Sequence, residues 1–137
     1  QQKVKEFIPA MRKGLKEYYK LVTGNVIFQN RLKGVGVLSK EDAISNGVAG
    51  PSGRASGWAC DVRKANPYAI YGELDFEQVV MEGCDSFDRY LLRLKEIEQS
   101  IKIIEQLIDN IPEGDYCAKV PKIIKLPEGH WYQTVDR

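Results

Sequence analysis

The stretch "SFDRYLLRLKEIEQSIKIIEQLIDNI" at residues 86–111 contains the strongest structural signal in the chain. Its apolar residues recur at intervals of three and four over about seven turns, which predicts one amphipathic helix roughly 39 Å long. Asp85 is the predicted N-terminal cap, and Pro112 and Gly114 end the helix. The positions predicted to be buried form one stripe: Phe87, Leu91, Leu94, Ile97, Ile101, Ile104, Ile108 and Ile111.

The segments before this helix predict a second long helix and a short one. Residues 4–22 have the same apolar spacing, and we expect the regular part of that helix to begin at Pro9 and to end at Gly24. The stretch "NVIFQNRL" that follows is expected either to add a short helical turn or to lead the chain out of the helix. Ser39 and Asp42 resemble a capping box ahead of a short helix over 40–46.

The remaining segments are expected to be mostly irregular. Residues 47–72 form a long glycine-rich loop, and "ELDFEQVV" after it alternates well enough for a short strand at best. We expect the C-terminal segment to pack back, as an extended segment or a strand, through Ile123, Ile124 and Trp131. The predicted fold is therefore mainly α: a single domain over 1–137 with two long helices, one short helix, a long glycine-rich loop and at most a short strand pair.

Composition places the chain among globular proteins that act in a reducing compartment. Hydrophobic residues make up 43% and charged residues 28% of the 137 residues. The net charge of +1 gives no electrostatic argument for nucleic acid or an anionic membrane surface. No apolar run approaches the ~20 residues that span a bilayer, and we find no signal peptide. Three cysteines without a CxxC pair favour the cytoplasm over a disulfide framework.

No complete catalytic or cofactor motif is present in these residues. "GVGVLS" lacks the third glycine of a dinucleotide fingerprint, and "GPSGRASG" lacks the lysine of a phosphate-binding loop. His130 is the only histidine, and no GxSxG motif supplies a nucleophile for it. Cys60, Cys84 and Cys117 stand too far apart to suggest a metal site within the chain. We therefore expect no catalytic, cofactor-binding or metal-binding residue in this segment.

Three stretches in order carry a resemblance to a known family. They are "NRLKGVGVLSKEDAISNGVAGPSGRASG", "DVRKANPYAIYGELDF" and "DRYLLRLKEIEQSIKIIEQ". Together they resemble the middle third of the large subunit shared by respiratory complex I, where it is the 49 kDa or D subunit, and the membrane-bound energy-converting nickel–iron hydrogenases. The residues on the family pattern are Arg54, Ser56, Gly57, Asp61, Arg63, Pro67, Tyr68, Tyr71, Arg89, Arg93, Glu96, Gln99 and Ser100.

The resemblance leaves two branches open. Gly53, Ala55 and Cys60 depart from the usual complex I residues, and "RASG" with the closing "LPEGHWYQTVD" favours the hydrogenase branch. The 49 kDa (D) subunit of an NADH-quinone oxidoreductase is the alternative. The resemblance implies a parent complex with a nickel–iron centre or a quinone, an iron–sulfur small subunit and membrane subunits as partners, and a place on the cytoplasmic side of the membrane. The motifs that hold metal or contact quinone in this family do not occur in this chain, which we expect to be an inactive internal fragment.

The glycine-rich loop has three interpretations. Its arginines and Asp61 pin it to helices of the same chain, or it supports a redox cavity or subunit interface, or it handles protons or substrate directly. On the family pattern, the residues assigned to cavity or interface support are Arg54, Ser56, Gly57, Asp61, Arg63, Tyr68, Arg93 and Glu96. A different class of function, a stand-alone helical scaffold or interaction module, fits the absence of any complete site.

Overall fold

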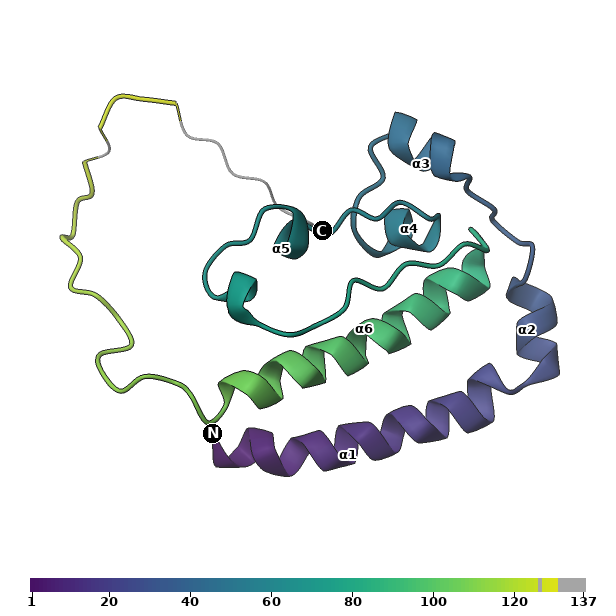
Figure 1. Ribbon diagram of the computed structural model, residues 1–137, viewed down its shortest axis with the longest axis horizontal. Coiled ribbons are helices and arrows are strands. Elements are labelled where there is room, and N and C mark those ends of the chain that lie inside the picture. The colour runs from purple at the N-terminus through teal and green to yellow at the C-terminus, as the bar shows by residue number, and fades with distance from the viewer. Residues whose placement is uncertain (126, 131–137) are drawn as a thin grey trace.

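The computed structural model describes residues 1–125 and 127–130 and is mainly α, which confirms the predicted fold class (Figure 1). None of these residues lies in a β-strand, so the short strand pair does not form among them. The elements in chain order are α1 (Gln2–Tyr18), the π-helix η1 (Tyr19–Thr23), α2 (Val26–Leu32), α3 (Lys40–Ser45), α4 (Gly50–Ala55), α5 (Val62–Ala65), the 3₁₀-helix η2 (Tyr71–Glu73) and α6 (Ser86–Leu107).

The two long helices, α1 and α6, run antiparallel and enclose the hydrophobic core (Figure 1). Ion pairs link α1 to the last turn of α6 and the residues just after it: Lys5 pairs with Asp109, and Arg12 Nη2 lies 2.7 Å from Glu105 Oε2. Because these ion pairs are exposed, they add little to the stability of the fold. Their main effect is on the position of α1 along α6. The core between the helices is formed by Ile8, Leu15, Leu94 and Ile101, with Met11, Tyr19, Tyr90 and Ile97 packed against it.

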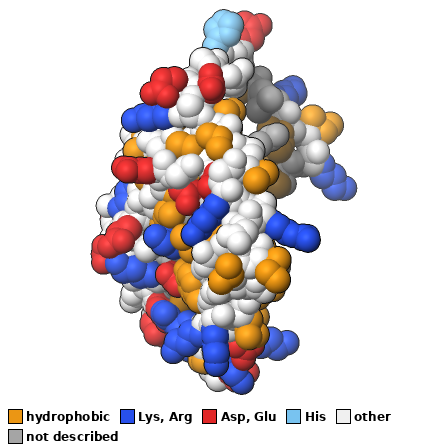
Figure 2. Space-filling model, turned by 90° about the vertical axis from the view of Figure 1, so that its right-hand side faces the viewer, with side chains coloured by type: hydrophobic (Ala, Val, Ile, Leu, Met, Phe, Trp, Pro, Cys, Tyr) orange, Lys and Arg blue, Asp and Glu red, His pale blue; other side chains and the backbone are white. Residues whose placement is uncertain are grey.

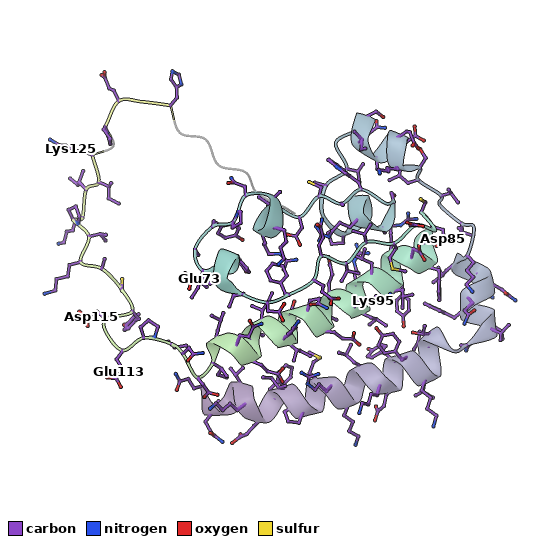
Figure 3. All side chains as sticks on the ribbon, viewed as in Figure 1. Glu73, Asp85, Lys95, Glu113, Asp115 and Lys125 are labelled. Atoms are coloured by element: carbon purple, nitrogen blue, oxygen red, sulfur yellow. The ribbon has the colours of Figure 1, made fainter. Side chains whose placement is uncertain are left out.

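Asp85 caps α6 as predicted and also ties the helix to an earlier segment. Its side chain accepts hydrogen bonds from the backbone N–H of Asp88 at 2.9 Å and of Gly34 at 2.8 Å. Figure 3 shows Asp85 where α6 begins, beside the connection from α2 to α3. The helix ends at Leu107 rather than at Ile111. Pro112 disfavours helical backbone in the residue before it, so the regular helix stops upstream of the apolar pattern.

The apolar stripe predicted for α6 is partly wrong, because the helix is covered on two sides. Leu92 is fully buried and Ile103 is 8% exposed, although neither belongs to the stripe. Ile104 and Ile111, which do belong to it, are 40% and 55% exposed. α1 covers one side of α6, and α4 with the segment after α5 covers another, so buried positions occur on more than one face.

α1 differs from its prediction at both ends. It begins at Gln2, and Pro9 lies inside it at an exposed position, where the ring removes one helical hydrogen bond without ending the helix. The last turn widens into the π-helix η1 before Gly24. Gly24 has a right-handed φ of −74° rather than the left-handed cap conformation. A Cβ there would lie 2.8 Å from the carbonyl oxygen of Lys20, which is why glycine fits.

α3 confirms the short helix predicted after Ser39, and "NVIFQNRL" takes the helical one of its two expected forms as α2. Asn25 caps α2, accepting from Ile27 N at 2.9 Å, and Ser39 caps α3, accepting from Asp42 N at 3.0 Å. Gly47, with a φ of +62°, follows α3 in the left-handed conformation that ends helices. The Phe28 ring on α2 meets Tyr90 of α6 edge-on at 4.9 Å between centroids. α2 therefore closes the end of the α1–α6 pair.

The predicted glycine-rich loop over 47–72 contains α4, α5 and η2, and the predicted strand after it is an irregular segment that lies along α6. Two glutamine side chains of α6 take the place of a neighbouring strand. Gln99 Oε1 accepts from Glu77 N at 2.9 Å, and Gln106 Oε1 accepts from Asp75 N at 2.8 Å. Since these amides pair with α6, the segment needs no strand partner at those positions.

The C-terminal segment does not pack back where it is described. Ile123 and Ile124 are 78% and 64% exposed, which contradicts their predicted burial, and Trp131 lies outside the described residues. Within the described part of the chain, no helix has both the length and the apolar character needed to cross a membrane.

Candidate functional site

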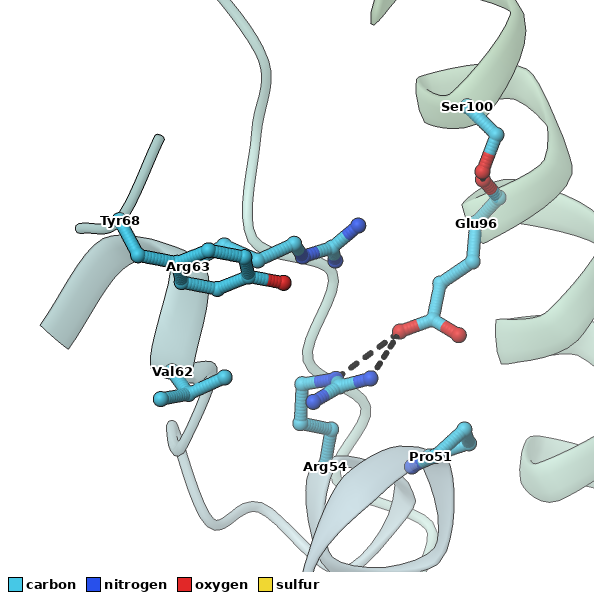
Figure 4. A pocket seen from close by; sticks show the side chains of 7 residues that line it. All are labelled: Pro51, Arg54, Val62, Arg63, Tyr68, Glu96 and Ser100. Carbon is cyan, nitrogen blue, oxygen red and sulfur yellow. Dashed lines mark hydrogen bonds and ion pairs between the residues drawn. The ribbon is translucent and has the colours of Figure 1, made fainter. Parts of the chain in front are cut away.

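α4 brings Arg54 against the middle of α6. Gly53 allows the segments before and after α4 to fold closely against this helix, because a Cβ at that position would collide with the carbonyl oxygen of Val48 and crowd the Trp58 ring. Arg54 is 4% exposed, and its Nε and Nη2 donate to Glu96 Oε1 at 2.9 and 2.6 Å (Figure 4). Its Nη1 donates to the carbonyl oxygen of Cys60 at 3.0 Å. Arg54 thus joins α4, the segment before α5, and α6.

Asp61 and Arg63 form a second, bidentate pair beside the first. Asp61 is 1% exposed and caps α5, accepting from the backbone N–H of Arg63 at 3.0 Å. The Arg63 guanidinium donates from Nε to Oδ1 at 2.9 Å and from Nη2 to Oδ2 at 2.6 Å. The same guanidinium lies 5.2 Å from the centre of the Phe76 ring. Packing and charge together fix its plane.

The electrostatics of this second pair favour the ionised forms. Burial by itself would raise the pKa of Asp61, but the hydrogen bonds from Arg63 and the charges of Arg63 and Arg54 hold that pKa below its ordinary value. The hydrogen bond to Asp61 raises the pKa of Arg63 above its ordinary value. Asp61 and Arg63 therefore form a charged pair, and it lies beside the Arg54–Glu96 ion pair.

The two pairs border a pocket of about 300 Å³ between α4, α5 and α6. Figure 4 shows the Tyr68 hydroxyl directed toward the side of the pocket where Glu96 lies. Ser100 Oγ donates to the backbone carbonyl of Glu96 at 2.8 Å, one turn along α6. The lining residues are Pro51, Arg54, Val62, Arg63, Tyr68, Glu96 and Ser100.

Of the residues assigned from the sequence, Arg54, Arg63, Tyr68 and Glu96 line this pocket, and Asp61 lies behind Arg63. The others do not line it. Ser56 is fully buried after α4, and its Oγ has no hydrogen-bond partner among the described residues. Gly57, with a φ of +80°, turns the chain after it. Arg93 is exposed and donates to the Arg89 carbonyl oxygen at 2.8 Å.

Sequence reasoning did not assign three of the lining residues to the site: Pro51, Val62 and Ser100. Ser100 belongs to the family pattern and stands one helical turn after Glu96, so the spacing held a signal for it. Pro51 and Val62 are lining residues only because of how α4 and α5 fold, and no pattern in the sequence pointed to them.

At this pocket each guanidinium group is paired with a carboxylate, so neither ion pair adds a net charge. These carboxylates already accept from guanidinium groups, so neither is placed as a base beside a nucleophile. The donor set does not suit a nickel–iron centre, because no group of three or more His, Cys, Asp or Glu side chains gathers among the described residues. No lining residue identifies a quinone contact. The arrangement fixes three segments relative to one another.

We predict that the isolated chain binds no nickel, iron or other transition metal stoichiometrically. Cys60 and Cys84 are partly buried in different parts of the fold and Cys117 is exposed, so they do not form a thiolate set. Elemental analysis of the purified protein checks this expectation. About one metal ion per chain, retained after dialysis against a weak chelator, would contradict it.

The pKa of Asp61 predicts a loss of stability in acid. Because this pKa is lower in the folded protein than in the unfolded chain, ionised Asp61 stabilises the fold above about pH 4, and the contribution disappears as the pH falls through the folded-state value. We expect the free energy of unfolding, measured in urea at a series of pH values, to fall on acidification less steeply in Asp61→Asn than in the wild type. Asp115→Asn, at an exposed position, should leave the slope unchanged.

The chain is similar to subunits of NADH-quinone oxidoreductases and to a chain of a respiratory membrane complex. The C/D subunit of the NADH-quinone oxidoreductase of Phocaeicola vulgatus is 62% identical over 135 residues, covering 98% of this chain and 26% of the relative. The D subunit of the Bacillus cytotoxicus enzyme is 48% identical over 136 residues, covering 98% of this chain and 37% of the relative. A solved structure of the membrane-bound sulfane sulfur reductase, an archaeal respiratory membrane complex, matches with a TM-score of 0.80 at 42% identity, over 88% of this chain and 33% of that chain.

The family profile for the respiratory-chain NADH dehydrogenase 49 kDa subunit matches residues 1–137. The chain belongs to this family. It spans 26% to 37% of the length of the relatives described above. Their names agree with the NADH-quinone oxidoreductase alternative and give no specific support to the hydrogenase branch favoured from the sequence.

Proposed function

We propose that this chain is the helical segment of the 49 kDa (D) subunit in an NADH-quinone oxidoreductase that works at the cytoplasmic face of the membrane. The observation that carries the proposal is the 62% identity to a C/D subunit over nearly the whole chain. In such a complex the segment acts with an iron–sulfur subunit and with membrane subunits, and the electrons pass between NADH and quinone through groups held by other parts of the complex.

The role of the segment in this proposal is support. The Arg54–Glu96 pair fixes α4 on α6, Arg54 Nη1 ties the segment before α5 to them, and the Asp61–Arg63 pair fixes the local conformation at the start of α5. Preorganised polar clusters of this kind hold neighbouring elements in one arrangement when all their members are satisfied. If the rest of the subunit builds a redox cavity against α4, α5 and α6, these ion pairs would hold that wall of the cavity in one position. This is the cavity-support interpretation, and the contacts within the chain supply its physical basis.

A second candidate is a membrane-bound reductase that delivers electrons to sulfane sulfur. It is supported by the structural match to the sulfane sulfur reductase, at 42% identity, which is lower than the identity to the quinone-linked relatives. A hydrogenase is the third possibility, carried by the sequence features around Gly53 and Cys60. The three differ in the acceptor or donor of electrons, so one purified complex can distinguish them.

The test is to tag the full-length subunit that includes this chain, purify its complex from membranes and measure three reactions side by side. We expect NADH-dependent reduction of a short-chain quinone, with neither polysulfide reduction nor hydrogen uptake at a comparable rate. Reduction of polysulfide in place of quinone would overturn the assignment in favour of the sulfane sulfur reductase type. Hydrogen uptake together with stoichiometric nickel would favour the hydrogenase branch.

A further inference from the structure

α1 and the π-helix η1 after it carry a second apolar stripe, most of which no described element covers. The core face of α1 packs on α6, but this neighbouring stripe, which we call the outer stripe, points elsewhere. The outer stripe repeats at intervals of three and four and consists of Val4, Phe7, Met11, Gly14, Tyr18 and, in η1, Leu21. Met11 lies at its border, where it also packs against the core. Phe7, Tyr18 and Leu21 are 55%, 56% and 66% exposed. In Figure 1, α1 lies at the edge of the molecule with α6 on one side only.

Gly14 is the unusual member of this stripe. Glycine in a helix interior weakens the helix relative to alanine. Nothing in the fold requires it, because a Cβ at this position would meet no atom within 4 Å. A hollow of about 270 Å³ surrounds this place, lined by Gly14, Glu17, Tyr18, Leu21 and Val22. Without a side chain at Gly14, a neighbouring helix could approach α1 closely and place one of its own side chains in the hollow.

We propose that the outer stripe is the docking face for an apolar helix from another part of the same subunit, with a large side chain seated at Gly14. The inference rests on the proposal that the chain is a segment of a 49 kDa (D) subunit. Nearly all of this chain aligns with relatives of which it covers 26% to 37%, so most of such a subunit is available to provide the helix. The outer stripe spans 17 residue steps, roughly 25 Å of helix, which one helix of similar length can cover.

The charge of α1 indicates which kind of helix would bind the outer stripe. It also argues against two other binding partners, a second copy of α1 and a lipid surface. Residues 1–24 contain six Lys or Arg against two Glu, so a helix with acidic residues beside its apolar stripe is complementary. Figure 2 shows Lys and Arg side chains with hydrophobic ones among them on the lower part of the face it presents. A second copy of α1 would oppose like charges. A lipid surface suits a basic apolar helix, but it gains nothing from a hollow at Gly14.

The test places a photoreactive benzoyl-phenylalanine at Phe7 of the full-length subunit in its purified complex. After irradiation we expect cross-linked peptides that join Phe7 to a segment of the same polypeptide outside these 137 residues, with the subunit unchanged in mass. The same group at the exposed Lys13, on the charged side of α1, should form none of these cross-links. Cross-links to another subunit, to a second copy or to lipid, or no cross-links at all, would overturn the proposal.

A pair of substitutions provides an independent measurement. Gly14→Leu should lower the amount of subunit recovered in the assembled complex severalfold, while Lys13→Leu, one residue away, leaves it unchanged. Equal recovery of both variants would contradict a close contact at Gly14. If the complex lacks NADH-quinone activity and Phe7 still cross-links within its own polypeptide, the proposed function fails while this inference stands.

Discussion

Replacing Arg54 with alanine is expected to destabilise the fold by about 3–5 kcal/mol, the range typical of removing one partner of a buried ion pair. Arg54 is 4% exposed and donates twice to Glu96 and once to the Cys60 carbonyl oxygen. Its loss leaves the Glu96 carboxylate partly buried without this donor and releases α4 from α6. Urea unfolding followed by circular dichroism measures the effect.

A double variant separates the ion pair from the packing of its side chains. Arg54→Met combined with Glu96→Leu replaces both charges with apolar groups of similar size, so no buried charge is left unpaired. We expect this variant to be more stable than either single substitution. If Arg54→Ala instead unfolds like the wild type but no longer associates with its partner subunit, the arginine serves an interface rather than the fold.

Local signals in the sequence were sufficient for several elements of this fold. Asp85 and Ser39 each accept a backbone hydrogen bond at the start of the helix for which they were predicted, because a cap depends on residues only three apart. The period of three and four likewise identified α1 and α6, since it reports a helical face without knowing what covers it. These are properties of single elements.

These local signals could not predict contacts between residues that are far apart in the sequence. Arg54 and Glu96 are 42 residues apart, and family resemblance rather than spacing placed both among the candidate residues. The strand predicted at 73–80 failed because Gln99 and Gln106 of α6 take its backbone hydrogen bonds. A sequence pattern shows that a segment needs hydrogen-bond partners, but it does not show that two glutamine side chains supply them.

The same limitation explains the error on α6. A single-stripe search assumes one covering element, and it selected Leu94 and Ile101 correctly because α1 covers them. Leu92 lies two residues from Leu94, roughly 200° around the helix, and is buried by the other side of the fold. A helix that packs on two sides has no single apolar face, so the true core includes residues that the search leaves out.

Replacing Leu92 with alanine should therefore destabilise the protein by about 2–5 kcal/mol, as much as Ile101→Ala in the predicted stripe. Both side chains are buried, at 0% and 4% exposure, and each substitution leaves a cavity that the surrounding fold fills only in part. Urea unfolding of the two variants, with helix content checked at zero denaturant, measures the loss at each position.

Ile104→Ala is the matched control, because Ile104 belongs to the predicted stripe but is 40% exposed. Its loss should stay under about 1 kcal/mol, as should that of Lys102→Ala, which removes only an exposed ion pair with Asp75. If Ile104→Ala were as damaging as Leu92→Ala, the single apolar face would be the real core. The second covering layer, including α4 and its arginine, would then contribute little to the stability of α6.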